Sequence, residues 1–338
     1  MTKTTSPLLL RAPRRVLPGW LGSLLAALLA SVLLGGGAWA QGLEPGLPSV
    51  TALPVAPGVW FFQGAAALGS PANRNFISNA GFVVTDDGVV VIDALGSPAL
   101  AREMLAEIRR VTPQPLRLVI VTHYHADHVY GLQVFKAAGA KVLAHDAGRG
   151  YLQADAAQLR LQASRQDLAP WVDADTHLVA ADQWLTGEET LLQLGATDLV
   201  IRHVGPAHTP EDVVVFLPRQ GVMFVGDLFF RGRLPFVGQA DSRLWLASLQ
   251  RLIDFKPRLV VPGHGPVSTD PLADLVLTRD YLLHLRRTMG QAARNLEPFD
   301  EAYAQADWSR FEGLPLFRVA NRMNAYNTYL LMEQQPEP

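Results

Sequence analysis

The sequence has no cysteine among its 338 residues. This absence excludes disulfide bonds, a lipoprotein anchor, a thiolate metal ligand and a cysteine nucleophile. Charged residues are also scarce at 18%, and the formal net charge of −2 gives no basic surface for nucleic acid. No G-x-S-x-G motif indicates a serine nucleophile. Any site chemistry must therefore come from His, Asp, Glu, Ser, Tyr and Lys side chains.

The N-terminal segment 1–40 has the pattern of a secretory signal peptide. Four basic residues precede the apolar run WLGSLLAALLASVLL, and Ala38 and Ala40 follow it in an A-x-A cleavage pattern. The alternative is a membrane anchor, for which this run is short. We therefore expect cleavage after Ala40, export to the periplasm by the Sec or twin-arginine route, and no stable membrane insertion of the mature chain. Removing these four from the 29 basic residues leaves 25 against 31 acidic residues, which argues against nucleic acid as a partner.

The rest of the chain has the pattern of an α/β domain. Residues 41–56 are rich in Gly and Pro and are predicted to form an irregular lead-in. After them, two similar blocks each combine several strand-like runs with one helix-like segment, PALAREMLAEIRRV in the first block and SRLWLASLQRLID in the second. Residues 271–295 and 315–335 read as two amphipathic helices. The pattern predicts a single domain over residues 57–335.

The motif HYHADH, at residues 123–128, places three histidines and an aspartate together. In an extended loop, His123 and His125 project to the same side and can hold one metal ion, while Asp127 and His128 turn toward a second point. Neutral imidazole and carboxylate are the ligand types expected for zinc. Burying these groups together without a metal would cost several kcal/mol, on the order expected for unpaired polar groups. The motif therefore predicts a metal site.

Further candidate ligands follow strand-like runs elsewhere in the chain. They are His208 in GPAHTPED, Asp227 in VGDLFF and His264 in VPGHGP. With the loop residues they make seven groups, enough for two zinc ions with Asp227 as a bridge. Histidines without ligand spacing are expected to be ordinary surface or core residues: His145, His177, His203 and His284.

The motifs THYHADH, HTPED, GDLFF and PGHGP, in this order, resemble those of the metallo-β-lactamase superfamily. The resemblance covers roughly residues 57–335. It implies an αββα sandwich, in which two mixed β-sheets face each other and are flanked by helices. It also implies the distribution of the ligands. The first zinc would be held by His123, His125 and His208, the second by Asp127, His128 and His264, with Asp227 between them. Asp93 matches an aspartate that supports the ligands in this family, with a strand-terminal cap as the alternative.

The resemblance also bears on subfamily and function. Asp227 stands where many β-lactamases have cysteine. Together with the export signal, this aspartate makes the chain most similar to periplasmic sulfur-oxidation and quinoprotein-relay zinc hydrolases. We expect an exported enzyme in which a zinc-bound hydroxide, oriented by the catalytic residue Asp127, cleaves a small thioester, lactone or β-lactam. The chain departs from the family pattern at Tyr130 and at Glu211, both positions where glycine is usual.

Two other functions stay open at this stage. A mononuclear iron persulfide dioxygenase would need only His123, His208 and Asp227. The chain could also be a non-catalytic metal-binding partner of a periplasmic quinoprotein or sulfur-oxidation system. The sequence does not predict an oligomeric state.

Substrate contacts are less clearly indicated than metal ligands. Arg231 and Arg233 follow Asp227 closely and are candidates for binding a substrate carboxylate, with solvated surface arginines as the alternative. Tyr124 and Tyr130 are candidates for lining the mouth of the site, with packing in the core as the alternative. The partner expected for all four is a small molecule.

Overall fold

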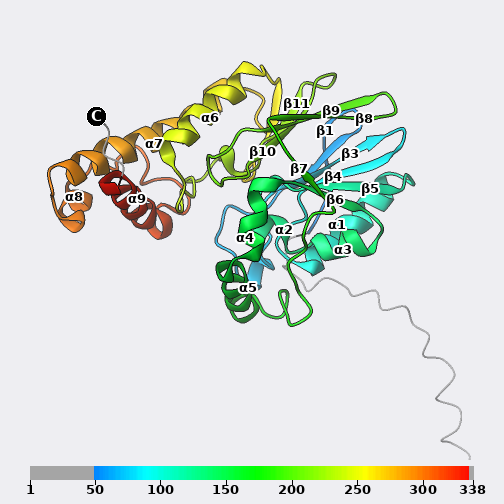
Figure 1. Ribbon diagram of the computed structural model, residues 1–338, viewed down its shortest axis with the longest axis horizontal. Helices are drawn as coiled ribbons and strands as arrows, with labels where there is room; N and C mark the ends of the chain where they lie inside the picture. The colour runs from blue at the N-terminus through cyan, green and yellow to red at the C-terminus, as the bar shows by residue number, and fades with distance from the viewer. Residues whose placement is uncertain (1–48, 335–338) are drawn as a thin grey trace, which may run out of the picture. The chain divides into compact units, whose positions relative to one another are not determined.

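The computed structural model describes residues 49–334. The expected leader 1–40, residues 41–48 of the lead-in and the last four residues lie outside this described part. Two mixed β-sheets form the centre of the described chain (Figure 1). The first sheet has seven strands in chain order: β1 (Leu53–Ala56), β2 (Val59–Phe62), β3 (Ala80–Thr85), β4 (Gly88–Ile92), β5 (Leu116–Ile120), β6 (Lys141–His145) and β7 (Gln183–Leu185).

The second sheet has five strands in the order β12-β11-β10-β9-β8. Their bounds are β8 (Glu189–Leu194), β9 (Thr197–His203), β10 (Val213–Leu217), β11 (Val222–Phe224) and β12 (Leu259–Val261). Strands β4 to β7 pair in parallel and β1 to β4 antiparallel, while β11 and β12 are the parallel pair of the second sheet. Both sheets are therefore mixed, as expected.

The α-helices of the described residues lie along the chain as follows: α1 (Pro98–Val111), α2 (Ala126–Val129), α3 (Leu132–Ala137), α4 (Arg149–Gln153), α5 (Asp155–Asp167), α6 (Ser242–Asp254), α7 (Pro271–Arg294), α8 (Phe299–Gln305) and α9 (Phe317–Gln334). Short 3₁₀ turns include η2 (Asp146–Gly148) and η3 (Gly226–Leu228). None of the helices in residues 49–334 is both long and apolar enough to cross a membrane.

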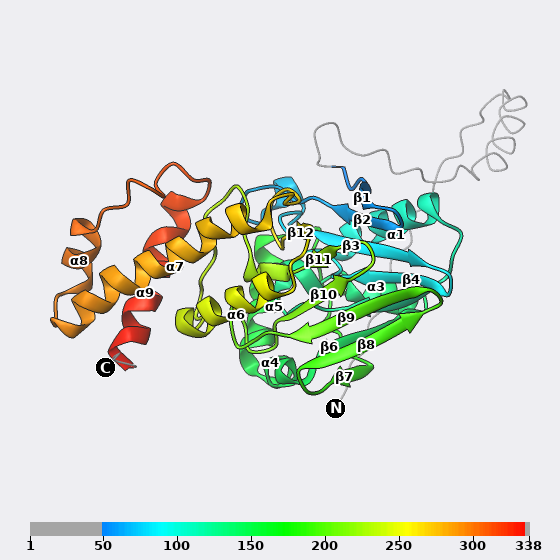
Figure 2. The ribbon, with the colours of Figure 1, turned by 90° about the horizontal axis from the view of Figure 1, so that it is seen from above.

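Apolar side chains hold the two sheets face to face and the helices outside them. Alternation along β4 sends Val90 and Ile92 into the space between the sheets, while Val89 and Val91 pack on the helical side. There Met104 of α1 joins the same cluster. A separate cluster packs α6 and α7 against the second sheet, and Figure 2 shows the sheets between their covering helices. The expected αββα sandwich is confirmed.

Several local predictions need correction or addition. The lead-in is not irregular at its end, because Leu53–Ala56 pair with β2 as an edge strand. The tail contains the two expected helices, now α7 and α9, but also the short helix α8 between them. The motif of residues 123–128 is extended only in its first half: Asp127 and His128 lie in the helical turn α2.

The sheet topology explains why the polar groups meet. Strands β4 and β5 are parallel, and so are β11 and β12. Strand β9 runs in the same direction as β11, because each is antiparallel to β10. Polar residues follow the carboxyl ends of these strands, and α/β proteins place their ligands at such strand ends. This edge of the sandwich therefore carries the candidate site.

Candidate metal centre

The seven candidate ligands converge in two adjacent groups. The first contains His123, His125, His208 and Asp227, and the second contains Asp127, His128 and His264. Within each group, one donor atom per residue lies within 4.8 Å of all the others. The groups match the distribution that the sequence resemblance implied.

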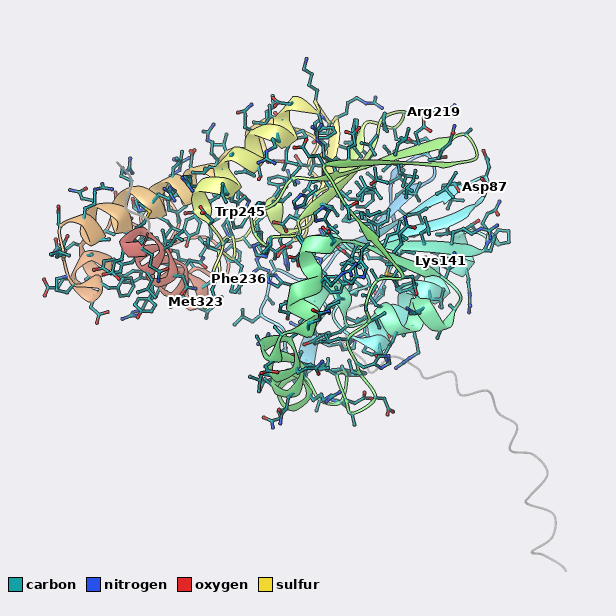
Figure 3. All side chains as sticks on the ribbon, in the orientation of Figure 1. Asp87, Lys141, Arg219, Phe236, Trp245 and Met323 are labelled. Carbon is teal, nitrogen blue, oxygen red and sulfur yellow. The ribbon has the colours of Figure 1, made fainter. Side chains whose placement is uncertain are left out.

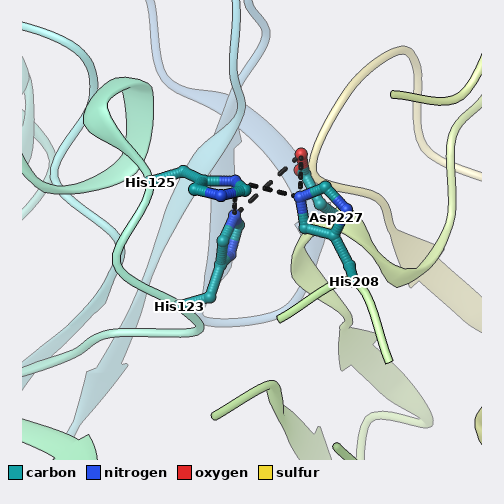
Figure 4. Close-up of side chains that lie close together, drawn as sticks. All are labelled: His123, His125, His208 and Asp227. Atoms are coloured by element: carbon teal, nitrogen blue, oxygen red, sulfur yellow. Dashed lines mark hydrogen bonds and ion pairs between the residues drawn. The ribbon is translucent and has the colours of Figure 1, made fainter. Parts of the chain in front are cut away.

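The first group brings together a loop after β5, a turn after β9 and the turn η3 (Figure 4). Nδ1 of His125 lies 3.2 Å from Nε2 of His123 and 2.9 Å from Nε2 of His208. The carboxylate Oδ2 of Asp227 lies 3.4 Å from Nε2 of His208 and 4.0 Å from Nε2 of His123. Three ring nitrogens and one carboxylate oxygen therefore point to a common centre.

The second group shares the Asp227 carboxylate with the first. Oδ1 of Asp227 lies 3.2 Å from Nε2 of His128, and Oδ2 lies 3.2 Å from Nε2 of His264. Oδ2 of Asp127 lies 3.4 Å from Nε2 of His264 and 3.8 Å from Nε2 of His128. Asp227 thus contacts residues of both groups, which is the arrangement that a bridging carboxylate requires.

The spacing of the donor atoms fits metal ions. Ligands at about 2.0–2.2 Å from a tetrahedral zinc ion lie roughly 3.3–3.6 Å from one another. The measured separations run from 2.9 to 4.0 Å in the first group and from 3.2 to 3.8 Å in the second. In addition, His128 Nε2 and Asp227 Oδ1 are buried and have no hydrogen-bond partner. Such atoms are costly in a protein interior unless a cation satisfies them.

Burial and charge set the protonation of the cluster. Burial lowers the pKa of His208 to about 3, and it also lowers the pKa values of His123 and His125. These rings are therefore neutral and present lone pairs. Burial also opposes charge on His128, yet the carboxylates around it, Asp227 foremost, raise its pKa well above the usual value. The second group thus favours a positive charge at its centre.

Hydrogen bonds at the far side of the rings fix their orientation through Asp93. Its Oδ2 accepts bonds from Nδ1 of His128 (2.9 Å) and from the hydroxyl of Thr122 (2.7 Å), while Oδ1 accepts from Thr122 N (2.8 Å). Because the Thr122 hydroxyl proton points to Asp93, its oxygen accepts from Nδ1 of His123 at 3.1 Å. One carboxylate therefore orients a ring in each group and leaves the Nε2 atoms facing inward.

His264 is fixed by the segment before β3. Its Nδ1 donates to the Ile77 carbonyl oxygen at 2.6 Å, which again leaves Nε2 free. The Asn79 side chain donates to the Pro262 and Gly265 carbonyl oxygens, at 2.9 and 2.7 Å, and so holds the loop that carries His264. Sequence analysis missed both Thr122 and Asn79, because neither residue type carries metal-ligand character.

Solvent reaches the cluster from one side. Among the seven groups only His125 and Asp127 are partly exposed, and the side chain of Asp127 is 17% exposed. Aromatic rings pack against His208 of the first group. Trp245 and the half-buried Phe236 meet the His208 ring edge-on at 5.2 and 6.3 Å between centroids, and Figure 3 labels both.

Neither tyrosine predicted at the mouth lies there. Tyr124 is 1% exposed, and its hydroxyl donates to the Val179 carbonyl oxygen at 3.4 Å. Tyr130 is also buried, and its hydroxyl lies 3.2 Å from the Ser164 hydroxyl. Both side chains are packing residues, so the structure does not support their predicted contact with substrate.

The two arginines differ from each other. Arg231 forms an ion pair with Asp274 at 2.7 Å and donates to the Val267 carbonyl oxygen at 2.8 Å, so its guanidinium is already engaged. Arg233 is not a solvated surface residue: it is buried, with Nη1 3.1 Å from Nδ1 of His264 and its guanidinium over the Phe230 ring. Arg233 therefore lies behind the candidate ligand His264 and not on the solvent-exposed surface.

The other histidines lie outside both groups, as expected. His145 and His203 stack on each other with 3.7 Å between ring centroids. Nε2 of His203 donates a hydrogen bond to the Pro210 carbonyl oxygen of its own turn at 2.9 Å. These contacts account for the two rings without a metal.

A family model described as the metallo-beta-lactamase superfamily matches residues 73–264, which contain all seven groups and most of both sheets. The chain belongs to this superfamily. Members of the superfamily bind metal ions, in agreement with the two groups of donors described above.

Curated relatives include members with different activities. A linear primary-alkylsulfatase from Pseudomonas sp. is 25% identical over 235 residues, covering 59% of this chain and 44% of that protein. A type 2 metallo-beta-lactamase from Bacillus sp. is 28% identical over 216 residues, covering 62% of this chain and 75% of the lactamase. The match thus spans less than half the length of the alkylsulfatase.

Solved structures show the same fold. A metallo-beta-lactamase from Pontibacter korlensis has a TM-score of 0.54 and 24% identity, covering 69% of this chain and 98% of that chain. A stereoselective inverting sec-alkylsulfatase from Pseudomonas sp. has a TM-score of 0.60 and 18% identity, covering 86% of this chain and 52% of that chain. At these identities the likeness establishes the superfamily fold.

Proposed function

We propose that this superfamily member is an exported hydrolase that holds two zinc ions and cleaves a small acyl substrate, namely a thioester, lactone or β-lactam. One observation carries the proposal: seven donors form two groups joined by Asp227, with the Nε2 atoms of His123, His128 and His264 turned inward by hydrogen bonds. Such pre-orientation is typical of metal sites that work without rearrangement.

His123, His125 and His208 would hold the first ion, and Asp127, His128 and His264 the second, with Asp227 between them. When bound, two zinc ions lower the pKa of water toward neutrality and polarise a substrate carbonyl.

Among the chain's own residues, we assign the catalytic role to Asp127. Its carboxylate is the one in the cluster that solvent reaches, so it can orient a water molecule and accept its proton. Phe236 and Trp245 offer an apolar surface beside His208 that suits an acyl group.

Sulfate-ester hydrolysis is a second candidate. The likeness to the sec-alkylsulfatase covers 86% of this chain, against 69% for the lactamase structure. A sulfate ester also combines an anion with an apolar chain, which suits the aromatic wall beside the cluster. The mononuclear iron dioxygenase gains less support, because a mononuclear site leaves His125 and the whole second group without a role.

The test is metal content together with a hydrolysis panel. We expect about two zinc ions per chain by elemental analysis, and turnover of a thioester, lactone, β-lactam or alkyl sulfate that a chelator abolishes and zinc restores. One iron and no zinc in the native protein would favour the dioxygenase. Activity that survives chelation would refute the mechanism. Two bound zinc ions without turnover of any panel member would favour the non-catalytic metal-binding protein.

Export gives a separate prediction. We expect the mature protein to begin at Gln41 and to fractionate with periplasmic contents, because AWAQ places a cleavage pattern directly before this residue. N-terminal sequencing of the native protein checks the position. An intact leader in the membrane fraction would show that the segment is an anchor.

A further inference from the structure

Glu211 occupies a position where the superfamily pattern led us to expect glycine. It follows His208 in the turn HTPED, between β9 and β10. Its side chain is directed inward and is only 4% exposed. A carboxylate at this depth calls for a physical explanation, since charged groups are seldom buried without a partner.

The Glu211 side chain connects two loops of the first group. Oε1 accepts a hydrogen bond from the backbone N–H of Tyr124 at 3.1 Å, and Tyr124 lies between His123 and His125. The slot that holds the side chain is tight, because a Cβ at Gly148 would lie 3.0 Å from Glu211 Cγ and 3.0 Å from the Tyr124 ring. Glu211 thus ties the turn of His208 to the loop of the other two imidazoles.

Glu211 has no counter-charge in direct contact among the described residues. Across residues 49–334, no lysine or arginine forms an ion pair with it. A carboxylate buried without a counter-charge in contact is costly. The first group carries one carboxylate, Asp227, which it shares with the second group. A cation bound by the first group is therefore the counter-charge that Glu211 lacks.

We propose that Glu211 is a positioning residue for the first group, which fixes its two loops relative to each other and raises its affinity for a divalent cation through the carboxylate charge. The inference rests on the proposed function in one respect, namely that zinc binds at this group.

The experiment measures zinc affinity by competition with a chromophoric chelator. A His128→Ala, His264→Ala background removes both imidazoles of the second group and leaves all four donors of the first, so that one binding event is observed. Glu211→Gln keeps an acceptor for Tyr124 N–H but removes the charge, and Glu211→Gly removes both. Glu301→Gln, on exposed α8, is the matched control.

We expect Glu211→Gln to weaken zinc binding by about 10-fold to 100-fold, the range found when groups supporting metal ligands are lost. Glu211→Gly should weaken it further, and Glu301→Gln should match the parent. Without metal, Glu211→Gln should unfold at the same temperature as the parent or a higher one, because an unbalanced buried charge has been removed. A purely structural role would instead leave the zinc affinity of Glu211→Gln unchanged and lower the unfolding temperature of Glu211→Gly alone.

Three results would overturn the inference. Unchanged zinc affinity in Glu211→Gln would show that the carboxylate charge does not contribute to zinc binding. Equal affinities in the Gln and Gly variants would show that the hydrogen bond to Tyr124 does not contribute. A wild-type protein that binds no zinc would overturn both this inference and the proposed function. The first two results, found together with a wild type that binds two zinc ions, would overturn the inference alone.

Discussion

Replacing Asp227 with alanine is expected to cost the protein both bound zinc ions rather than one. Its Oδ2 lies 3.4 Å from Nε2 of His208 in the first group and 3.2 Å from Nε2 of His264 in the second. Its Oδ1 lies 3.2 Å from Nε2 of His128. Alanine would remove the negative charge common to both groups and leave only neutral imidazoles in the first. Affinity at both positions should therefore fall by more than the roughly 10–100-fold that loss of a supporting residue costs.

Zinc content after dialysis, with stepwise affinities from chelator competition, measures this effect. Hydrolytic activity should fall with the metal and should not return at zinc concentrations that saturate the wild type. Asp198→Ala, an exposed aspartate on β9, is the control and should retain two ions. Loss of a single ion from Asp227→Ala would mean that Asp227 serves one group and does not bridge.

The convergence of these ligands could be predicted because it depends on strand ends. Asp93 comes directly after β4, and Asp227 and His264 lie three residues past the ends of β11 and β12, whose directions are fixed by the α/β topology. Parallel strands bring such positions to one edge whatever the details of packing. The same pattern gave the two-sheet fold, because runs such as β4 are apolar on both faces and must be covered on both.

What could not be predicted depends on where single side chains point. Arg231 and Arg233 are separated by one glycine, yet one pairs with Asp274 of α7 and the other packs against His264. Tyr124 lies between two candidate ligands, but the extended backbone turns it to the opposite side, into the core. Sequence spacing indicates on which side of an extended backbone a side chain lies. Tertiary packing determines which residues it contacts there.

Glu211 is a second case in which the sequence did not predict what a side chain contacts. The sequence indicated that a side chain stands where glycine was expected, but gave no partner for it. The partner is a backbone N–H distant in sequence, that of Tyr124. Contacts to main-chain groups leave no residue-type signal, which is also why Asn79 and its bonds to the loop of His264 could not be foreseen.

Asp93→Asn is expected to weaken the second zinc position selectively, although it removes no ligand. In the native site, the Asp93 carboxylate accepts three hydrogen bonds, from Thr122 N, from the Thr122 hydroxyl and from Nδ1 of His128. An asparagine amide has one acceptor oxygen and a donor NH₂. In either orientation of the amide, the NH₂ group faces an N–H or O–H that now lacks an acceptor.

The orientation that keeps the Thr122 backbone bond has the larger consequence for the metal. It places the amide NH₂ against Nδ1 of His128, so that this nitrogen must lose its proton to accept the bond. The proton then moves to Nε2, the atom that faces Asp227 at 3.2 Å, and the lone pair needed by the second group is lost. The opposite orientation instead leaves the buried Thr122 N–H unpaired, at a cost of about 1–3 kcal/mol in folding free energy.

We therefore expect the second zinc equivalent of Asp93→Asn to bind about 10-fold to 100-fold more weakly, with a smaller change in the first. Chelator competition gives both constants, and Asp198→Asn on the surface of β9 serves as the isosteric control. The pattern differs from that of Asp227→Ala, in which both equivalents fall together. A second equivalent as tight as in the wild type would show that the His128 tautomer is set by the metal itself and not by Asp93.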